Sequence, residues 1–177
     1  VTAFNFTLLA SFSLGDGTRL QSIERMYFLS GAGNDSVTGG GLDDVFDGGG
    51  GADRLRGLAG QDILIGGAGN DTLAGGTGQD ALEGGAGADV FEFTTAPVLD
   101  EIDSIEDFEQ GLDLIRLTGS VFGALPAGAL QAQAFVSGTV ASDALDRVIH
   151  DSVTGILWYD ADGTGAIEAV AFASLTA

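Results

Sequence analysis

Seven aspartates recur at intervals of nine residues and form the most regular chemical pattern in this chain. Each is the sixth residue of one of seven consecutive nine-residue repeats, which together run from Ser30 to Glu92. Carboxylates at a fixed spacing are candidate metal ligands, because hard divalent cations bind carboxylate and carbonyl oxygens. The seven aspartates are Asp35, Asp44, Asp53, Asp62, Asp71, Asp80 and Asp89.

The charge and composition of the repeats favour calcium over other metals. Residues 30–92 contain nine Asp and two Glu against two Arg, a net charge of −9, and stacked carboxylates repel one another steeply at short range. Calcium accepts six to eight carboxylate and carbonyl oxygens at about 2.3–2.6 Å, whereas magnesium demands tighter octahedra and retains its waters. Zinc prefers imidazole and thiolate ligands, and the chain has one histidine and no cysteine.

The elements that must position these carboxylates are glycine turns and short strands. Glycine fills most of positions 1, 2 and 4, and 20 of the chain's 30 glycines lie in the repeats. Six turn residues thus precede three residues that we expect to form a strand. Position 8 should face inward, because the flanking positions include Arg54, Arg56 and Glu83. The inward residues would be Val37, Phe46, Leu55, Leu64, Leu73, Leu82 and Phe91. So short a repeat predicts a solenoid whose units cannot fold alone.

The composition of the whole chain excludes several classes of partner. Its 26 acidic residues against six arginines and no lysine give a net charge of −20, which disfavours nucleic acid and anionic membrane surfaces. No apolar run approaches the roughly 18 residues of a membrane helix, so we expect no membrane insertion. The first residues do not resemble a signal peptide. We expect a covalently joined upstream domain, because the chain begins in the middle of a strand-like pattern.

The repeats resemble the nonapeptide G-G-x-G-x-D-x-U-x, with U apolar, of RTX (repeats-in-toxin) or hemolysin-type calcium-binding proteins. The repeats that match it at every defined position begin at Gly48, Gly66, Gly75 and Gly84. The other three each depart at one glycine, at Ser30, Leu42 and Leu58. The resemblance implies an all-β fold, a parallel β-roll with two nonapeptides per turn and short antiparallel strands capping both ends. Loops two repeats apart would then stack on the same side.

The resemblance also implies how ions are held. In that family an ion lies between stacked loops and takes both position-6 aspartates, carbonyls 2 and 4 of one loop and carbonyls 1 and 3 of the next. The five pairs expected here are Asp35–Asp53, Asp53–Asp71, Asp71–Asp89, Asp44–Asp62 and Asp62–Asp80. The expected carbonyl ligands are Gly31, Gly33, Gly40, Leu42, Gly48, Gly49, Gly50, Gly51, Gly57, Leu58, Ala59, Gly60, Gly66, Gly67, Ala68, Gly69, Gly75, Gly76, Thr77, Gly78, Gly84 and Ala86. About five ions would nearly neutralise the repeats, and the sites that use Leu42 and Leu58 should be the weaker ones.

The segments on either side of the repeats are expected to cap the roll within one structural domain. Residues 1–29 should form capping strands, residues 30–92 the roll, and residues 93–177 a C-terminal cap. The run from Asp103 to Phe108 resembles the D-x-I-x-D-F segment that closes the solenoid of serralysin-type proteases. The C-terminal stretch resembles the cap and uncleaved type I export signal of many RTX proteins.

Three acidic positions outside the repeats are further candidates. Asp107 lies two repeat lengths after Asp89 and could complete another site, with a solvated acidic turn as the equal alternative. Glu24 resembles a calcium-binding acidic residue before the roll of serralysins, although its spacing to the repeats is two residues longer. Residues 160–163 resemble the start of an EF-hand loop. A hairpin turn is favoured there, since no glutamate follows at the required spacing.

These features predict a non-enzymatic module that binds calcium and folds outside the cell or at its surface. It would support type I secretion and the stability of a larger secreted protein, with the export machinery as its transient partner. His150, the only histidine, has no evident nucleophile or pocket around it, so no catalysis is expected. The parent could be a secreted protease, lipase or polysaccharide epimerase, or instead a surface adhesin or surface-layer protein. Glycan binding by the module itself is the less favoured alternative.

Overall fold

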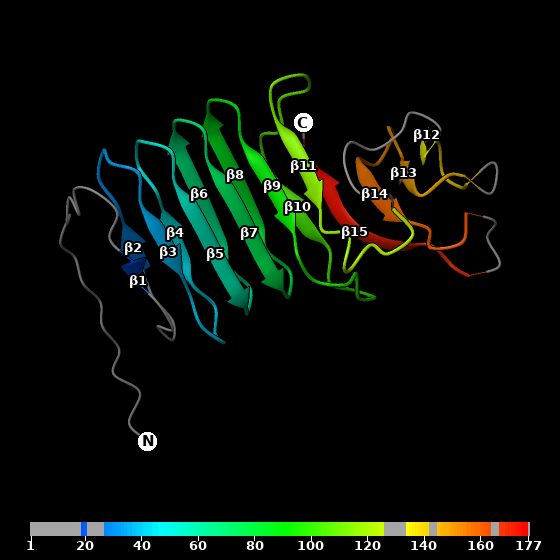
Figure 1. The fold of residues 1–177 in the computed structure, drawn as a ribbon, viewed down its shortest axis with the longest axis horizontal. Coiled ribbons are helices and arrows are strands. Elements are labelled where there is room, and N and C mark those ends of the chain that lie inside the picture. Colours follow the sequence, from blue (N-terminus) through cyan, green and yellow to red (C-terminus); the bar gives the residue numbers. More distant parts are fainter. Residues whose placement is uncertain (1–18, 21–26, 126–133, 142–144, 164–166, 177) are drawn as a thin grey trace.

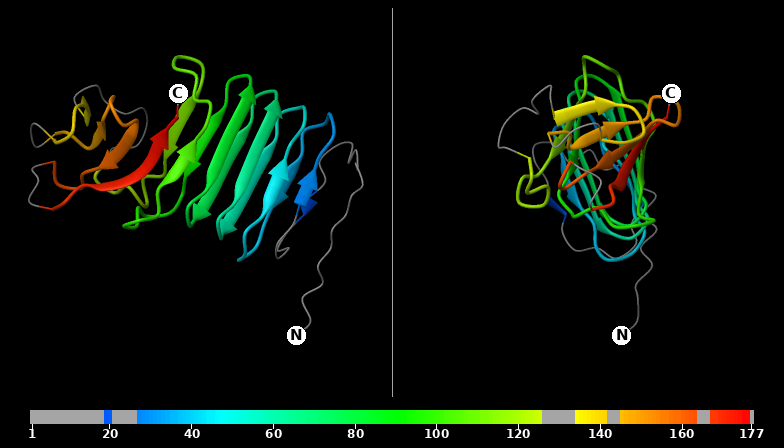
Figure 2. Two further views of the ribbon diagram at one scale, coloured as in Figure 1. Left: turned by 180° about the vertical axis from the view of Figure 1, so that it is seen from behind. Right: turned by 90° about the vertical axis from the view of Figure 1, so that its right-hand side faces the viewer.

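The computed structural model describes residues 19–20, 27–125, 134–141, 145–163 and 167–176, and the elements in these ranges are all β-strands. The strands form two sheets that face each other along a flattened solenoid (Figure 1; Figure 2, right). The expected all-β class is therefore confirmed. In sheet order, the six-stranded sheet contains β1 (Arg19–Leu20), β3 (Ser36–Thr38), β5 (Arg54–Ala59), β7 (Thr72–Thr77), β9 (Val90–Phe93) and β11 (Leu114–Leu117). The nine-stranded sheet contains β12 (Phe135–Ser137), β13 (Val148–His150), β14 (Ile156–Tyr159), β15 (Val170–Leu175), β10 (Asp103–Ile105), β8 (Ala81–Ala86), β6 (Ile63–Ala68), β4 (Val45–Asp47) and β2 (Tyr27–Leu29).

Successive repeats alternate between the two sheets, so that one turn of the solenoid takes two repeats. In the six-stranded sheet Val37 pairs with Leu55 and Leu55 with Leu73, in parallel and two repeats apart. In the other sheet Phe46 pairs with Leu64 and Leu64 with Leu82 at the same interval. This register is that of a parallel β-roll with two nonapeptides per turn.

The core of the roll consists of the position-8 side chains, as the alternation of the strands predicts. All seven are at most 1% exposed. Each strand contributes one such residue to the space between the sheets, because its neighbours on either side point outward. The apolar core is consequently narrow, at one large side chain per repeat.

The central strands are longer than the three residues expected from the sequence. Strands β5 to β8 have six residues each, because the first three residues of the following repeat also pair with the coil below. For example, Ala68 N donates to Gly49 O at 2.8 Å, and Gly51 N donates to Ala68 O at 2.8 Å. Glycine allows this close stacking of turn backbones, which side chains would prevent.

The start of the roll differs from the expected antiparallel cap. Strands β1 and β2 pair in parallel with β3 and β4, so they add rungs to the solenoid. The strand-like alternation of apolar residues in the sequence suits either pairing, and the sequence alone does not distinguish the two. Residues 1–18 and 21–26, with the candidate Glu24, lie outside the described part of the chain.

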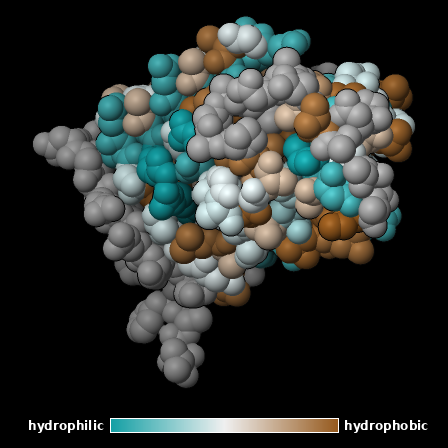
Figure 3. Space-filling view, turned by 45° about the vertical axis from the view of Figure 1, so that its right-hand side comes forward, coloured by the Kyte–Doolittle hydropathy of each residue, from teal (hydrophilic) through white to brown (hydrophobic). Residues whose placement is uncertain are grey.

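The C-terminal end closes the roll with strands from the end of the chain. Strand β15 lies parallel to β10, while β14 pairs antiparallel with both β15 and β13 (Figure 1). Phe172 on β15 packs edge-on against Phe93 and Phe122, with ring centroids 5.1 and 5.7 Å apart, and Phe122 contacts Tyr159 at 4.9 Å. In the face shown in Figure 3, hydrophilic residues gather over the roll and hydrophobic ones towards the cap.

Candidate metal centre

The repeat aspartates form two ladders, one along each side of the roll. Within each ladder, the backbone N–H of one aspartate donates to Oδ1 of the aspartate two repeats later. The donor–acceptor distances are 2.7 Å for Asp35–Asp53, Asp44–Asp62 and Asp53–Asp71, 2.8 Å for Asp71–Asp89 and 2.9 Å for Asp62–Asp80. All seven side chains are at most 3% exposed. The structure thus brings together the five pairs that a turn of two repeats predicts.

The second carboxylate oxygen of most of these aspartates has no hydrogen-bond partner. Among the described residues, the buried side-chain oxygens without a partner are Asp35 Oδ1 and the Oδ2 atoms of Asp53, Asp62, Asp71, Asp80 and Asp89. Asp44 differs, because its Oδ2 accepts from Gly40 N at 3.1 Å. Burying an unpaired carboxylate oxygen is costly, so six such atoms, four on one ladder and two on the other, indicate that a positively charged partner binds there.

The unpaired Oδ2 atoms of Asp53, Asp62, Asp71, Asp80 and Asp89 lie directly against position 1 of their repeats, where glycine leaves no side chain in the way. A Cβ atom at Gly66 would lie 2.5 Å from Asp71 Oδ2 and 2.5 Å from the carbonyl oxygen of Gly84 in the next coil. At Gly48 the same position is bordered by Asp53 Oδ2 and by the Gly66 carbonyl oxygen at 2.6 Å. A carboxylate oxygen and a carbonyl oxygen of the next coil therefore both lie beside the glycine at position 1. These are the two kinds of oxygen ligand that calcium accepts. The residues present fit a calcium ion.

The loop backbones supply the carbonyl groups that such an ion needs. Gly69 stacks directly on Gly51 with φ of 135°, a conformation suited to glycine. Several of the expected carbonyl ligands also accept backbone hydrogen bonds, for example Gly31 O from Gly50 N and Gly40 O from Ala59 N. A carbonyl oxygen has two lone pairs, so one such bond leaves a pair for a metal. Their coordination of calcium stays a prediction.

Burial changes the acidity of the ladder carboxylates. It raises the pKa of Asp53 and Asp62 to about 6 and that of Asp80 to about 7, from an ordinary 3.8. The amide hydrogen bond from the preceding coil opposes this rise in pKa, and the charges of neighbouring aspartates add to it. Burial likewise raises the pKa of Asp71 and Asp89. Near neutral pH these carboxylates favour either a proton or a cation in place of an isolated negative charge.

Both ladders continue past the repeats, through two aspartates that the two-repeat spacing does not predict. Asp80 N donates to Asp103 Oδ1, and Asp89 N donates to Asp113 Oδ1, both at 3.0 Å. The two spacings exceed two repeats because longer loops precede these rungs. The sequence does carry a signal for both aspartates, because each is followed two positions later by an apolar residue that packs on the core, as in the repeats. These residues are Ile105 after Asp103 and Ile115 after Asp113.

Asp107 has a different position from the one that its spacing to Asp89 suggests. Its Oδ1 accepts from Gly84 N at 2.8 Å and its Oδ2 from Gly85 N at 2.7 Å. The residue beside Asp89 in the ladder is Asp113 instead. Asp107 therefore caps the amides at the start of the seventh repeat, and metal binding by it stays a prediction.

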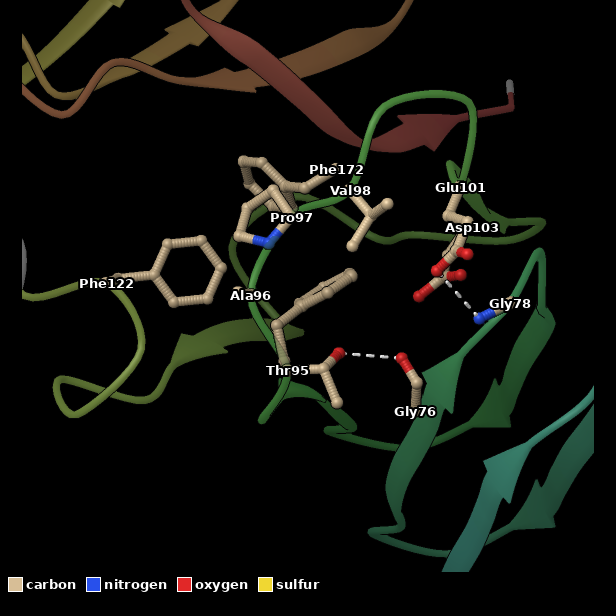
Figure 4. A pocket seen from close by; sticks show the side chains of 11 residues that line it. Gly76, Gly78, Thr95, Ala96, Pro97, Val98, Glu101, Asp103, Phe122 and Phe172 are labelled. Atoms are coloured by element: carbon tan, nitrogen blue, oxygen red, sulfur yellow. Dashed lines mark hydrogen bonds between the residues drawn. The ribbon is translucent and has the colours of Figure 1, made fainter. Parts of the chain in front are cut away.

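A small cavity lies at the end of one ladder, between the sixth repeat and the segment that closes the roll. Gly78 N donates to Glu101 Oε2 at 3.3 Å, and Thr95 Oγ1 donates to the carbonyl oxygen of Gly76 at 2.7 Å (Figure 4). Asp103 borders the same cavity, whose volume of about 20 Å³ is that of a single water molecule or ion. Burial, and then the charge of Asp80, raises the pKa of Asp103 to about 8.

Other charged groups have local structural partners. On the outer face of the six-stranded sheet, Arg54, Arg56 and Arg116 surround Glu92, at N–O distances of 2.8, 3.9 and 3.5 Å. Asp160, in the EF-hand-like segment, accepts from Asp162 N at 3.0 Å and Gly163 N at 2.7 Å, as in a turn. The ring centroid of His150 lies 6.3 Å from that of Phe135.

Two properties of the described residues limit the kind of site. No three or more His, Cys, Asp or Glu side chains come together there as a metal-binding group, so backbone carbonyls would have to complete the coordination between two aspartates. In the same part of the chain no helix has the length and hydrophobicity needed to cross a membrane.

Comparison with known protein families agrees with this geometry. The family described as RTX calcium-binding nonapeptide repeat (4 copies), HemolysinCabind, matches residues 29–64 and again residues 56–91. The repeats of the β-roll are therefore similar to those of this calcium-binding family. The match ends before β10 and does not include the C-terminal cap.

A solved structure similar to the chain is the solution structure of the AlgE6R3 subunit from the Azotobacter vinelandii mannuronan C5-epimerase. The two sequences are 28% identical over 81% of this chain and 71% of that one, with a TM-score of 0.28. A score this low does not support a residue-by-residue superposition. Comparison with curated proteins gave no significant match.

Proposed function

We propose that the chain is a non-enzymatic calcium-binding module whose roll folds when Ca²⁺ binds between its stacked loops outside the cell. The observation that supports this most directly is the set of six buried carboxylate oxygens without partners among the described residues, distributed over both ladders. Each lies where successive coils meet, so a cation there would join one coil to the next. The site would then stabilise the fold and would not act on a substrate.

The proposed ligands are the five aspartate pairs of the repeats with the loop carbonyls around them. We add Asp103 as the partner of Asp80 and Asp113 as the partner of Asp89, because their Oδ1 atoms continue the same ladders. The ion would supply positive charge next to carboxylates that are otherwise unpaired. Asp107 would take part only if its carboxylate also reached an ion while it caps Gly84 and Gly85.

The energy available from such sites is comparable with the stability of a domain. Extracellular modules of this type bind calcium with dissociation constants of about 10⁻⁴–10⁻³ M. Calcium at ten times the dissociation constant stabilises the folded state by about 1.4 kcal/mol per site, and five sites would give about 7 kcal/mol. The narrow core of position-8 residues makes a contribution of this size important for folding.

This dependence on calcium would serve export through a type I secretion system. At the low calcium concentration of the cytosol, repulsion among the aspartates would keep the roll unfolded and able to pass a narrow channel. Outside the cell, calcium would fold it next to the larger protein to which it is joined. That parent could be a secreted protease, lipase or epimerase, or a surface adhesin. Hydrolase motifs upstream would favour the first class and tandem β-sandwich repeats the second.

Circular dichroism and calcium calorimetry on the full chain test the proposal. With chelator we expect the strand signal of the roll to be lost, and with millimolar calcium we expect it to return with about five or more ions bound. A triple variant with Asp53→Asn, Asp62→Asn and Asp71→Asn should lose most of this response. A matched variant with Asp47→Asn, Glu83→Gln and Glu109→Gln removes the same charge outside the ladders and should respond normally. A strand signal unchanged by chelator would refute the proposal.

A further inference from the structure

Ser30 is the one residue at position 1 of a repeat that carries a side chain. The six equivalent residues are the buried glycines Gly39, Gly48, Gly57, Gly66, Gly75 and Gly84. At every one of them, an added Cβ atom would meet Oδ2 of the aspartate in the same repeat. Position 1 thus decides whether a side chain lies against that oxygen.

In the first repeat a side chain does lie against that oxygen. The Ser30 hydroxyl donates a hydrogen bond to Asp35 Oδ2. The corresponding Oδ2 atoms of Asp53 and Asp71, on the same side of the roll, have no partner among the described residues. The oxygen of Asp35 without a partner is Oδ1. The Oδ2 atom of Asp35 therefore has a neutral hydrogen-bond donor, which the Oδ2 atoms of Asp53 and Asp71 lack.

We infer that Ser30 makes the Asp35–Asp53 pair the weakest calcium site of the roll. A carboxylate oxygen that already accepts a hydrogen bond gains less from a cation, and at the six glycine positions no side chain competes for that oxygen. Asp53 is then the first aspartate of this ladder whose repeat has glycine at position 1. The inference rests on the proposed function, since it assumes that ions bind between aspartates of successive coils.

The opposite effect is the natural alternative, because a serine hydroxyl oxygen is also a possible calcium ligand. In that case Ser30 would add a ligand, and its removal would weaken the site. The position of the hydroxyl argues against this, because it already contacts Asp35 Oδ2 as a hydrogen-bond donor, and its oxygen would have to turn from the carboxylate towards an ion. The two interpretations predict opposite changes in affinity.

Calcium titration of the full chain, with calorimetry for affinity and native mass spectrometry for the number of ions, tests the inference. Ser30→Gly should tighten the weakest site about tenfold, the factor that corresponds to one hydrogen bond to a charged group. At a calcium concentration that leaves this site empty in the original chain, the variant should hold one more ion. Ser30→Ala keeps a side chain in the space and should tighten the site less than glycine does.

Gly48→Ser is the matched reverse change, because it places the same side chain beside Asp53 Oδ2. It should remove one ion at the same calcium concentration. If this variant does not fold, Ser30→Gly still tests the inference. That variant should fold, because glycine occupies the six equivalent positions. Unchanged or weaker binding in Ser30→Gly, while the original chain binds calcium at its other sites, would overturn the inference. A chain that binds no calcium at all would instead contradict the proposed function.

Discussion

Buried carboxylates differ in their hydrogen-bond partners between the roll and the C-terminal cap. Asp71 in the roll and Asp160 in the cap are both about 1% exposed. Oδ1 accepts amide hydrogen bonds in both, but only Asp71 has a buried oxygen, Oδ2, without a partner among the described residues. A buried acid is therefore not by itself evidence for a metal. The evidence lies in an oxygen that the protein leaves without a partner, repeated from coil to coil.

The two regions also differ in what packs them. In the cap, Phe172 and Tyr159 bring edge-on aromatic contacts to the end of the roll, while each repeat contributes a single inward side chain. The cap should thus derive its stability from apolar packing and the roll from bound ions. Four changes test this contrast, and we take them from the largest expected effect to the smallest.

Phe172→Ala should give the largest loss. Its ring is 3% exposed and packs against Phe93 and Phe122, and truncating such a residue costs about 3–5 kcal/mol. Urea unfolding at saturating calcium should show this loss at any excess of the ion, because the contact is apolar. A loss that disappears at higher calcium concentration would mean that the cap depends on ions as the roll does.

Asp71→Asn should weaken the roll only when calcium is present. Asp71 belongs to two expected sites, so the loss of both would cost about 3 kcal/mol at ten times the dissociation constant. The asparagine oxygen can still accept from Asp53 N, so little else changes. Thermal melting with calcium and with chelator measures the difference. Asp47→Asn, a change of the same charge on the outer side of β4, is the control and should melt like the original chain.

Lower pH should stabilise the calcium-free roll. Burial raises the pKa of Asp53, Asp62, Asp80 and Asp103 above 3.8, so the folded state holds protons more tightly than the unfolded state. This contribution to stability is complete below about pH 4 and is lost as pH rises through 6 to 8. With chelator, the strand signal in circular dichroism should therefore increase as pH falls from 8 to 5.

Excess calcium should abolish or reverse this pH dependence, because protons and calcium compete for the same carboxylates. The same titration repeated in the triple aspartate variant is the control, and there the effect of pH should be smaller. If stability without calcium instead fell towards pH 5, the ladder carboxylates would have lowered and not raised pKa values in the folded roll.

Leu58→Gly should give the smallest effect, a gain of about 1 kcal/mol or less. Leu58 has φ of 84° and is 47% exposed, so it strains the backbone and gains little from burial. Glycine removes the strain but adds entropy to the unfolded chain, which limits the gain. Ala59→Gly is the control, because Ala59 has no positive φ and the change should destabilise the roll. Calcium-dependent melting temperatures compare the two variants.

Much of the roll could be predicted from the sequence because every repeat has the same surroundings. Alternation in the strand directs Leu64 inward and leaves Arg54 and Arg56 outside, and the inward position is confirmed for all seven repeats. The aspartate pairs also follow from the repeat length once two repeats make one turn. The added strand residues, such as Gly57–Ala59, were missed because they pair only when neighbouring turns stack closely.

The ends of the roll were predicted less well, because there the repeat pattern stops. The two-repeat spacing selects Asp107, but loop lengths between residues 94 and 112 place Asp103 and Asp113 on the ladders instead. Strand β15 pairs with β10 from the far end of the chain, and no local pattern encodes that contact.

By itself, the sequence determined the period of the roll, its inward residues and its supply of carboxylates, because these properties recur in every repeat and depend on local alternation. The tertiary structure decided which oxygens are left without partners, where each ladder ends and which strand closes the sheet. Those properties depend on how coils stack and on how distant segments pack, and a periodic sequence carries no information about where its own periodicity is broken.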